Sequence, residues 1–599
     1  MTSASAHADD QPRAPHALAG AVAGMLAAAV AIGAAQFAAG LTVPQGSPVV
    51  AVGQAAIDLT PPPVKDFAIS AFGTADKTVL LGGILVVLAL YAALVGILAV
   101  RRLAIGMWGL ALFAFIGLVA ALTRPDSTTE YIVPTLAGAA AGAFALTWLA
   151  RAAGRLSTSR SRSRSRRPRG AGGSGSRTPD APEVPEVPEV PPAPETLTPP
   201  DLPPPPAAAS ASGAASPRPE SAASPSSSFT YLPNPDDPGS PSGPARRRFL
   251  VSSGIAAVAA VAGTVAGREL ATRRDVTLAR AALRFPRPTV AAPPLPAGSD
   301  LHIPGLSSFI TPNDSFYRVD TALLLPQVDP STWQLRIHGM VQREVTITFA
   351  ELLKRPLIED YVTLTCVSDP VGGPYVGNAK WLGASLAALI RQARPRAGAS
   401  QLLCTSVDGF TSGTPLQVVL DGRDALLAVA MNGTALPVEH GFPARMVVPG
   451  LYGYVSATKW VTDIEVTTFA DASAYWVDRG WSQQAPIKTE SRIDVPAIGA
   501  TLRPGPTPVA GVAWAQHKGV AAVEVRVDRG PWHEARLAAV PDIDTWRQWV
   551  FQWQATPGNH VLEARATDKT GYTQTAVQAQ PVPNGASGYP SATVTVRGS

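Results

Sequence analysis

The sequence predicts a multidomain protein in which N-terminal transmembrane α-helices are followed by an α+β domain and then by an all-β sandwich. Three observations lead to this prediction: long uncharged apolar runs before residue 150, a Pro-, Ser- and Arg-rich stretch after it, and short strand patterns in the C-terminal half. With 599 residues the chain is too long for a single core. We expect a four-helix transmembrane region 1–150, a linker 151–245, a signal-like segment 246–270, a linker 271–300, an α+β domain 301–475 and an all-β domain 476–599.

Four apolar runs in the N-terminal part reach or approach the length that crosses a bilayer. A helix needs about 20 apolar residues to cross a hydrocarbon core of about 30 Å, and the runs span residues 17–39, 79–99, 103–122 and 132–149. Basic residues, which favour the cytoplasmic side, follow the second and fourth runs. The lipid bilayer is therefore an expected partner, with the N-terminus and the end of the fourth helix on the cytoplasmic side of the cell membrane.

Composition limits the cofactors and partners. All eight histidines lie outside the four runs, so no bis-histidine haem is expected there, and an anchor or docking scaffold is the favoured role of these helices. Two cysteines, Cys366 and Cys404, are too few for a disulfide framework or a four-cysteine iron–sulfur cluster. The net charge of +5 is small for this length, so we expect no nucleic-acid partner.

The segment 157–245 reads as a tether. It is rich in Pro, Ser, Ala and Arg and holds few large apolar residues. Such a composition cannot offset the entropy cost of ordering the backbone, which predicts a disordered, partly polyproline-II linker.

The end of the tether carries Arg246, Arg247 and Arg248, then Phe249-Leu250 and a weakly apolar run at 254–267. This resembles the twin-arginine export signal. An ordinary fifth transmembrane helix with basic flanking residues is the alternative. Under either interpretation one more crossing places the chain after about residue 270 outside the cytoplasm.

A cysteine stands at the end of a predicted strand. Residues 361–365 alternate β-branched and larger side chains, and the Pro- and Gly-bearing turn 370–373 ends the pattern. Cys366 is thereby delivered to a strand end, where a side chain can face a cleft. A lone cysteine in such a place is more often a buried structural residue, so Cys366 alone decides nothing.

A second stretch changes the interpretation of Cys366. Residues 440–460, His-Gly-Phe-Pro-Ala-Arg-Met-Val-Val-Pro-Gly-Leu-Tyr-Gly-Tyr-Val-Ser-Ala-Thr-Lys-Trp, resemble the cofactor-binding signature of the sulfite oxidase family of molybdopterin enzymes. Four further landmarks follow that family's order, at 311–317, 363–366, 408–411 and 431–433. The resemblance runs from about residue 301 to the C-terminus.

The resemblance implies a cofactor and the residues that hold it. The family's domain holds one pyranopterin dithiolene and one molybdenum, and Cys366 matches both the metal ligand and a catalytic position. A soft thiolate suits a metal that cycles by two electrons. Arg445 and Lys459 match the anchors of the cofactor's phosphate, which needs charge-assisted donors. Cys404 is expected in the core. The implied cofactor-binding residues are Asn313, Phe316, Tyr317, Thr405, Ser406, His440, Arg445, Ser456, Thr458 and Lys459.

Departures from the family affect the expected substrate. Sulfite-oxidising members follow the metal cysteine with a basic run, whereas this chain has Asp369 there. Lys380 replaces the usual arginine, and Phe410 replaces a tyrosine; with Cys366 they are the expected catalytic residues. Because a carboxylate near the metal opposes a dianion, we expect a sulfoxide or another small oxo-compound rather than sulfite.

The region 476–599 has the pattern of an immunoglobulin-like sandwich. Alternating runs at 522–527, 549–553 and 560–567 are separated by turn sequences. The region resembles the family's C-terminal dimerisation domain, which implies a homodimer; a lone sandwich that stiffens the enzyme is the alternative.

These expectations combine into one function. The chain is expected to be a membrane-anchored, extracytoplasmic molybdopterin oxidoreductase that transfers an oxygen atom and exchanges electrons with a separate, unidentified carrier. The alternative is a membrane scaffold with a catalytically inactive domain of the same type.

Overall fold

The computed structural model describes residues 14–61, 64, 76–124, 127–164, 243–272 and 275–598. The chain divides into two units, Met1–Gly154 with Arg248–Ser599, and Arg155–Arg247. Most of the predicted tether, residues 165–242, lies outside the described residues.

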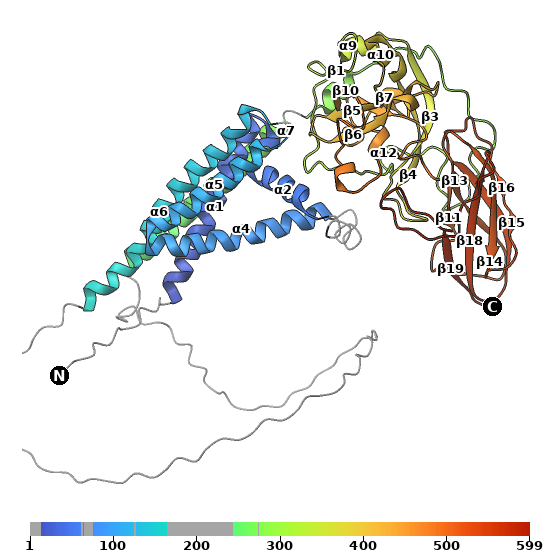
Figure 1. Cartoon of the computed structure of the whole chain (residues 1–599). Helices are drawn as coiled ribbons and strands as arrows, with labels where there is room; N and C mark the ends of the chain where they lie inside the picture. The colour runs from blue at the N-terminus through green and yellow to red at the C-terminus, as the bar shows by residue number, and fades with distance from the viewer. Residues whose placement is uncertain are drawn as a thin grey trace, which may run out of the picture. The chain divides into compact units, whose positions relative to one another are not determined.

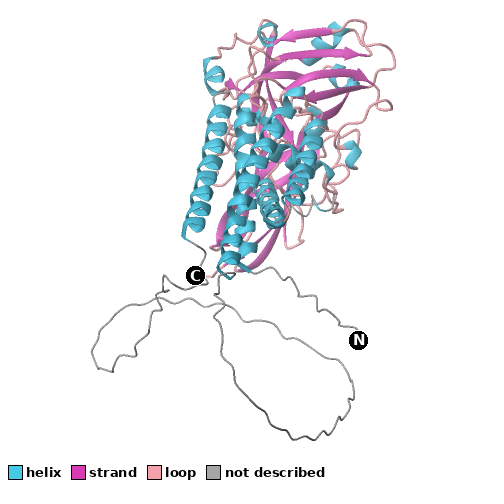
Figure 2. Ribbon diagram, turned by 90° about the vertical axis from the view of Figure 1, so that its left-hand side faces the viewer, coloured by secondary structure: helices cyan, strands magenta, loops and turns pink. Residues whose placement is uncertain are grey.

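The apolar runs form long helices, whose ribbons are drawn in Figures 1 and 2. Each of the four predicted runs is helical, and the segment at 246–270 lies in a fifth helix. By length and composition all five could cross a membrane: α1 (Ala14–Leu41), α4 (Asp76–Arg101), α5 (Leu103–Leu122), α6 (Ile132–Arg164) and α7 (Gly243–Thr272).

Two features of the helical region differ from the sequence expectation. Helix α6 continues to Arg164, past the expected start of the tether at residue 157, because Ser and Arg are tolerated in a helix and the next Pro is Pro168. A short helix, α2 (Pro48–Leu59), was not predicted; it follows the 3-10 turn η1 (Pro44–Gly46) and starts at a Pro, a residue that suits the first turn of a helix.

Glycines allow the helices to approach closely. A Cβ on Gly24 of α1 would collide with the carbonyl oxygen of Ala92 in α4, and a Cβ on Gly33 would lie 2.6 Å from the carbonyl oxygen of Ala260 in α7. Helix association through small residues is common where the solvent is lipid, because backbone contact replaces a hydrophobic driving force.

The α+β domain contains two sheets, one mixed and one antiparallel, drawn between green and orange in Figure 1. Strand β1 pairs parallel with β10 in the first sheet, and β9 pairs with β7 beside the second. The first sheet has the order β2 (Val345–Thr348), β1 (Gln334–Gly339), β10 (Val461–Thr467), β5 (Gln401–Ser406), β6 (Thr411–Pro415). The second has the order β3 (Leu357–Thr365), β4 (Val376–Ser385), β7 (Leu426–Met431), β8 (Thr434–Ala435), with β9 (Arg445–Val447).

Short helices connect these strands: α9 (Phe349–Leu353), α10 (Leu386–Ala393), α11 (Leu416–Leu420) and α12 (Gly453–Ser456). Thr348 and Glu351 form a capping box that starts α9. The predicted α+β class is thus confirmed. Cys404 lies fully buried in the core around β5, as expected.

The C-terminal region is a two-sheet β-sandwich. Residues of both sheets, among them Val523, Trp549 and Leu562, share one core. The predicted all-β class is confirmed, while the immunoglobulin-like character and the homodimer stay predictions. The sheets have the orders β11 (Glu490–Val495), β13 (Gly505–Trp514), β17 (Arg547–Ala555), β16 (Arg536–Leu537), and β12 (Thr501–Leu502), β19 (Ser591–Val596), β18 (Gly558–Asp568), β14 (Val520–Val527), β15 (His533–Glu534).

The sandwich supports the strand that leads to Cys366. Trp546 donates from its backbone N–H to Thr363 Oγ1 at 2.7 Å and from its indole to the carbonyl of Phe309 at 2.8 Å. Trp514 and Trp546 belong to the same core cluster as the first sheet. Strand β3 is therefore fixed from the sandwich side as well as by its own sheet.

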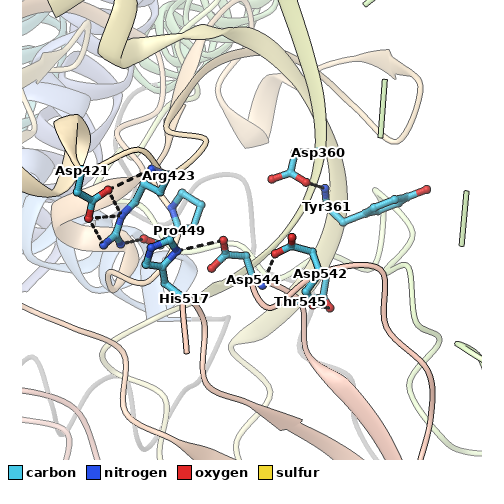
Figure 3. A network of polar contacts seen from close by, with 9 residues as sticks. All are labelled: Asp360, Tyr361, Asp421, Arg423, Pro449, His517, Asp542, Asp544 and Thr545. Atoms are coloured by element: carbon cyan, nitrogen blue, oxygen red, sulfur yellow. Dashed lines mark hydrogen bonds and ion pairs between the residues drawn. The ribbon is translucent and has the colours of Figure 1, made fainter. Parts of the chain in front are cut away.

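Carboxylates gather where the sandwich meets β3 (Figure 3). Asp544 Oδ2 lies 3.3 Å from His517 Nδ1, and Asp542 accepts the backbone N–H of Asp544 at 2.8 Å. Asp360 accepts the N–H of Tyr361 at 2.8 Å. Burial raises the pKa of Asp360 to about 7, and the charge of Asp542 adds to the shift.

Candidate cofactor site

Cys366 lies just beyond β3, in a turn with defined hydrogen bonds. Its N–H donates to the carbonyl of Tyr375 at 2.9 Å, its carbonyl accepts from Asp369 N–H at 3.2 Å, and its sulfur lies 3.0 Å from Ser368 Oγ. Burial raises the pKa of the thiol, and the Ser368 hydrogen bond opposes this shift. A thiol with a raised pKa is a poor free nucleophile, whereas a bound cation would deprotonate it. The environment fits a metal ligand better than a nucleophile.

Arg445 in β9 is a buried cation, 5% exposed. Its guanidinium donates to the carbonyls of His440 at 3.1 Å, Ala457 at 3.2 Å and Met446 at 3.3 Å, and its carbon lies 5.0 Å from the centre of the Trp381 ring. No ion pair between Arg445 and an acidic residue is present among the residues described. Burial lowers its pKa to about 10, so the charge is held at an energetic cost.

Lys459 is a second buried cation near Arg445. Its Nζ lies 3.0 Å from Asp320 Oδ2 and donates to the carbonyl of Glu439 at 3.0 Å. The same carboxylate accepts from Arg318 Nε at 2.7 Å. Burial lowers the pKa of Lys459 to about 8, with Arg445 contributing. The Asp320 carboxylate therefore pairs with two cations, Lys459 and Arg318. The charge of a third cation, Arg445, is close enough to lower the pKa of Lys459.

His440 contributes a neutral ring to this cluster. Its Nε2 lies 3.1 Å from the carbonyl oxygen of Asn313. Burial lowers its pKa to about 3, and the charges of Arg445 and Lys459 add to the shift. The imidazole is therefore uncharged at neutral pH and can offer a hydrogen bond without adding charge.

Aromatic residues form one wall beside the cations. Phe316 stacks on Tyr317 with 5.2 Å between ring centres and meets Trp381 and His440 edge-on at 5.9 and 5.5 Å. Burial raises the pKa of Tyr317 well above its usual value, with Cys366 and Arg445 both close enough to affect it. Asn313 accepts from the side-chain amide of Asn432 at 2.8 Å, which ties two of the landmarks together.

The donor set fits a molybdopterin cofactor on chemical grounds. A phosphate would receive charge-assisted hydrogen bonds from cations whose pKa values are lowered by burial. A thiolate within electrostatic reach of Lys459 would supply the soft metal ligand. The structure brings Asn313, Phe316, Tyr317, His440, Arg445 and Lys459 into one cluster; their contact with the cofactor stays a prediction.

Two of the remaining predicted contacts are engaged within the fold. Ser456 donates to the carbonyl of Leu451 at 2.9 Å, and Thr458 Oγ1 lies 2.5 Å from Ser412 Oγ. Thr405 lies in β5 and Ser406, 3% exposed, ends that strand. The contact of all four residues with the cofactor stays a prediction.

Two of the predicted catalytic residues make their printed side-chain contacts with residues outside this cluster. Lys380 pairs with Glu359 at 2.8 Å. Because neighbours in a strand point to opposite faces, Lys380 lies on the other face of β4 from Trp381, which packs on Arg445. Phe410 packs on Tyr475 with 5.8 Å between ring centres. Their catalytic roles stay predictions.

Asp369 carries less negative charge than its sequence position indicates. Its Oδ1 accepts the N–H of Tyr375 at 2.9 Å, while Oδ2 is buried and has no partner among the described residues. Burial raises its pKa to about 7. Near neutral pH this group is only partly ionised, so its repulsion of an anionic substrate is weaker than the sequence indicates.

Sequence reasoning missed Asp320 and Ser368. Asp320 lies three residues beyond Tyr317, and Ser368 two residues beyond Cys366. Both residues lie next to a landmark. The ion pair between Asp320 and Lys459 joins residues 139 positions apart, so it depends on the fold and gives no local sequence pattern.

Comparisons with known proteins identify the family of this domain. The profile of the family described as oxidoreductase molybdopterin binding domain matches residues 322–476. Sulfite oxidase of Gallus gallus is 31% identical over 295 residues, 41% of this chain and 63% of that protein. The uncharacterized oxidoreductase YuiH of Bacillus subtilis (strain 168) is 30% identical over 153 residues, 26% of this chain and 74% of that protein. The crystal structure of sulfane dehydrogenase SoxCD from Paracoccus pantotrophus is 23% identical with a TM-score of 0.40, covering 45% of this chain and 75% of that chain.

The fold and site thus define a molybdopterin-binding domain. The chain belongs to the sulfite oxidase family of molybdopterin-dependent oxidoreductases. It spans 63% of the Gallus gallus sulfite oxidase and 53% of the mitochondrial sulfite oxidase of Rattus norvegicus, to which it is 29% identical.

Proposed function

We propose that this chain is a molybdenum-dependent oxidoreductase, anchored in the cell membrane with its catalytic domain outside the cytoplasm. It transfers an oxygen atom between water and a small substrate in a two-electron reaction. The observation that carries the proposal is the cysteine at a strand end within electrostatic reach of a buried, under-neutralised group of cations. A bound molybdopterin would supply the oxygen-atom and two-electron chemistry.

The chain's own residues have separate tasks under this proposal. Cys366 holds the metal, Arg445 and Lys459 hold the phosphate, and His440 offers a neutral hydrogen-bonding ring beside them. The aromatic wall of Phe316, Tyr317 and Trp381 excludes water from this side, which strengthens the electrostatic interactions inside it.

The substrate is proposed to be a sulfoxide or another small oxo-compound. Support comes from the lack of spare cations: Asp369, in the turn of Cys366, offers no positive charge, and Lys380 is already paired with Glu359. A site for a dianion needs guanidinium forks, and under this proposal the fork of Arg445 is assigned to the phosphate of the cofactor.

Two measurements test the function. Protein from homologous expression should contain molybdenum and pterin, and an artificial redox dye should reveal turnover with a member of a panel of sulfoxides, sulfite, nitrate and chlorate. A chain that binds the cofactor but turns over none of them would favour an inactive scaffold. A chain without molybdenum and pterin would remove the enzyme proposal altogether.

Export of the catalytic domain is a separate prediction. Arg246 and Arg247 begin the fifth candidate span, Arg246–Ala271, and folded export would deliver a domain already holding its cofactor. Replacing both arginines by Lys should leave the first four helices inserted and keep the domain inside, because the export signal requires the arginine pair. A reporter fused after Ser599 that works only outside the cytoplasm should lose its activity. Full reporter activity would instead identify an ordinary fifth helix.

A further inference from the structure

The helical region contains a cavity of about 80 Å³ that no part of the proposed chemistry uses. Its walls come from α1, α4, α5 and α6, together with the start of α2. They consist mainly of Ala, Gly, Leu and Val side chains, with the rings of Tyr91 and Phe113 on one side. Tyr91 already donates its hydroxyl to the carbonyl of Gly109 at 2.8 Å.

Two hydroxyls in this lining lack partners. Ser47 is 1% exposed and Thr135 is 4% exposed, and neither hydroxyl has a hydrogen-bond partner among the described residues. Buried helical hydroxyls ordinarily bond a carbonyl one turn earlier, as Thr147 does with Ala143 at 2.7 Å. An unpaired hydroxyl in an apolar surrounding is unfavourable, so both positions need an acceptor from outside the chain.

The segments that carry the two hydroxyls approach the same glycine. A Cβ on Gly117 of α5 would be 3.5 Å from Thr135 Cγ2 and 3.6 Å from Cβ of Pro48, the residue after Ser47. Gly117 therefore lies between the two hydroxyl-bearing segments. Its missing side chain helps to keep this part of the cavity open.

The size and lining of the cavity limit its occupant. One water needs about 10–15 Å³ of such space, so the cavity has room for roughly six water-sized groups, about one six-membered ring. Water needs two to four polar partners, and two hydroxyls cannot hold a group of six waters. The occupant should therefore be apolar, ring-sized, and equipped with an acceptor oxygen.

We propose that this cavity binds the ring of a lipophilic quinone, whose carbonyl oxygen accepts hydrogen bonds from Ser47 and Thr135. The choice of a quinone rests on the proposed function, because the proposed reaction needs a carrier of two electrons. A quinone and its quinol exchange two electrons and two protons, which balances the transfer of one oxygen atom between water and a substrate. An ester carbonyl of a membrane lipid shares the same acceptor chemistry, and the experiment separates the two sources.

The test measures binding by the full chain in lipid nanodiscs. The probe is a 1,4-benzoquinone with a decyl tail, and decylbenzene, which lacks the carbonyls, is its matched control. The quinone should bind saturably at about one per chain, and decylbenzene at least tenfold more weakly. Ser47→Ala and Thr135→Val should each weaken quinone binding about three- to tenfold, whereas Thr147→Val, outside the lining, should not.

A second pair of variants tests the position of the ring. Gly117→Leu should abolish quinone binding by filling the space between the two hydroxyl-bearing segments. Gly117→Ala should retain it, because the added Cβ meets only ordinary van der Waals contacts at 3.5 and 3.6 Å. Retained binding in Gly117→Leu would contradict the placement.

Other outcomes would overturn the proposal. Equal binding of decylbenzene, or unchanged quinone binding in the Ser47→Ala, Thr135→Val double variant, would show that the hydroxyls do not recognise a carbonyl. A diacylglycerol that displaces the quinone at equal concentration, with the same dependence on both hydroxyls, would assign the cavity to a lipid. Dye-linked turnover of the same samples separates the two proposals: turnover without quinone binding contradicts this inference alone, and quinone binding without turnover contradicts the proposed function alone.

Discussion

At the scale of single residues, the cofactor site depends on buried cations that lack sufficient counter-charge. Arg445 is held by three carbonyls, and Lys459 shares Asp320 with Arg318. Buried cations are energetically unfavourable without a bound anion, and a bound phosphate would stabilise them.

Removal of the Arg445 guanidinium should release the cofactor. Arg445→Ala is expected to lower molybdenum and pterin content more than tenfold, because the phosphate loses its charge-assisted donors. Arg445→Lys should be intermediate, since an ammonium keeps the charge but lacks the two-pronged donor geometry. Arg336→Ala is the control, because Arg336 pairs with Glu344 on the surface. Equal cofactor content in Arg445→Ala and Arg336→Ala would exclude Arg445 as an anchor.

Cys366, Arg445 and Lys459 could be proposed from sequence as metal ligand and phosphate anchors, roles that stay predictions, whereas their charge environment could not be predicted. Cys366, Arg445 and Lys459 lie in motifs that can be recognised in the sequence alone. Asp320 and the depressed pKa of Lys459 arise from burial and from partners distant in sequence, which only the fold specifies. The motif position of Lys380 could be recognised in the sequence. Its ion pair with Glu359 could not, because that pair depends on which face of β4 the side chain occupies.

At the scale of elements, the turn after η4 (Val438–His440) positions both anchors. Gly441 has a φ of +107°, and a Cβ there would lie 3.0 Å from the Cβ atoms of Arg445 and Lys459. Backbone conformation and close packing therefore both require glycine at this position.

Gly422 provides a matched control, with the same φ of +107° and nothing within 4 Å of an added Cβ. Gly441→Ala and Gly422→Ala should both lose about 1 kcal/mol or more of unfolding free energy from backbone strain. Only Gly441→Ala should also lose molybdenum and pterin, because it displaces Arg445 and Lys459. Cofactor content and urea denaturation of both variants check this; a shared loss of cofactor would point to strain alone.

The class and approximate place of the helices and strands were also predictable, but several boundaries were not. The run at 103–122 coincides with α5 because the apolar stretch ends at charged or polar residues on both sides. The end of α6 was missed because the continuation of a helix through Ser and Arg has a weak sequence signal. Helix α2 was missed because a short helix between two spans has an equally weak signal.

At the scale of the whole molecule, the contact between the sandwich and β3 should respond to pH. Asp360 has a pKa of about 7, raised by burial and by Asp542, against about 3.9 in an unfolded chain. Between these values the folded state retains a proton that the unfolded state has lost. The unfolding free energy should therefore fall as pH rises from about 4 to about 7 and then level off.

Asp360→Asn should remove this pH dependence. The Asn side-chain oxygen can still accept the N–H of Tyr361, so the local hydrogen bond is retained. Relative to the parent chain, the variant should gain stability progressively from pH 4 to pH 7, by up to about 4 kcal/mol at the upper end. Urea unfolding followed by tryptophan fluorescence at several pH values measures it. A constant difference between variant and parent would mean that Asp360 does not titrate in this range.

The most direct test of the central claim compares the two cysteines. Cys366 lies in the candidate site, and Cys404 is buried in the core, where burial raises its pKa to about 12. Molybdenum, pterin and dye-linked turnover should be measured in the parent chain, in Cys366→Ser and in Cys404→Ala. The account predicts about one molybdenum and one pterin in the parent, retained pterin with turnover below a few per cent in Cys366→Ser, and near-normal values in Cys404→Ala. Cys366→Ser with substantial turnover, or a parent chain without molybdenum, would contradict it.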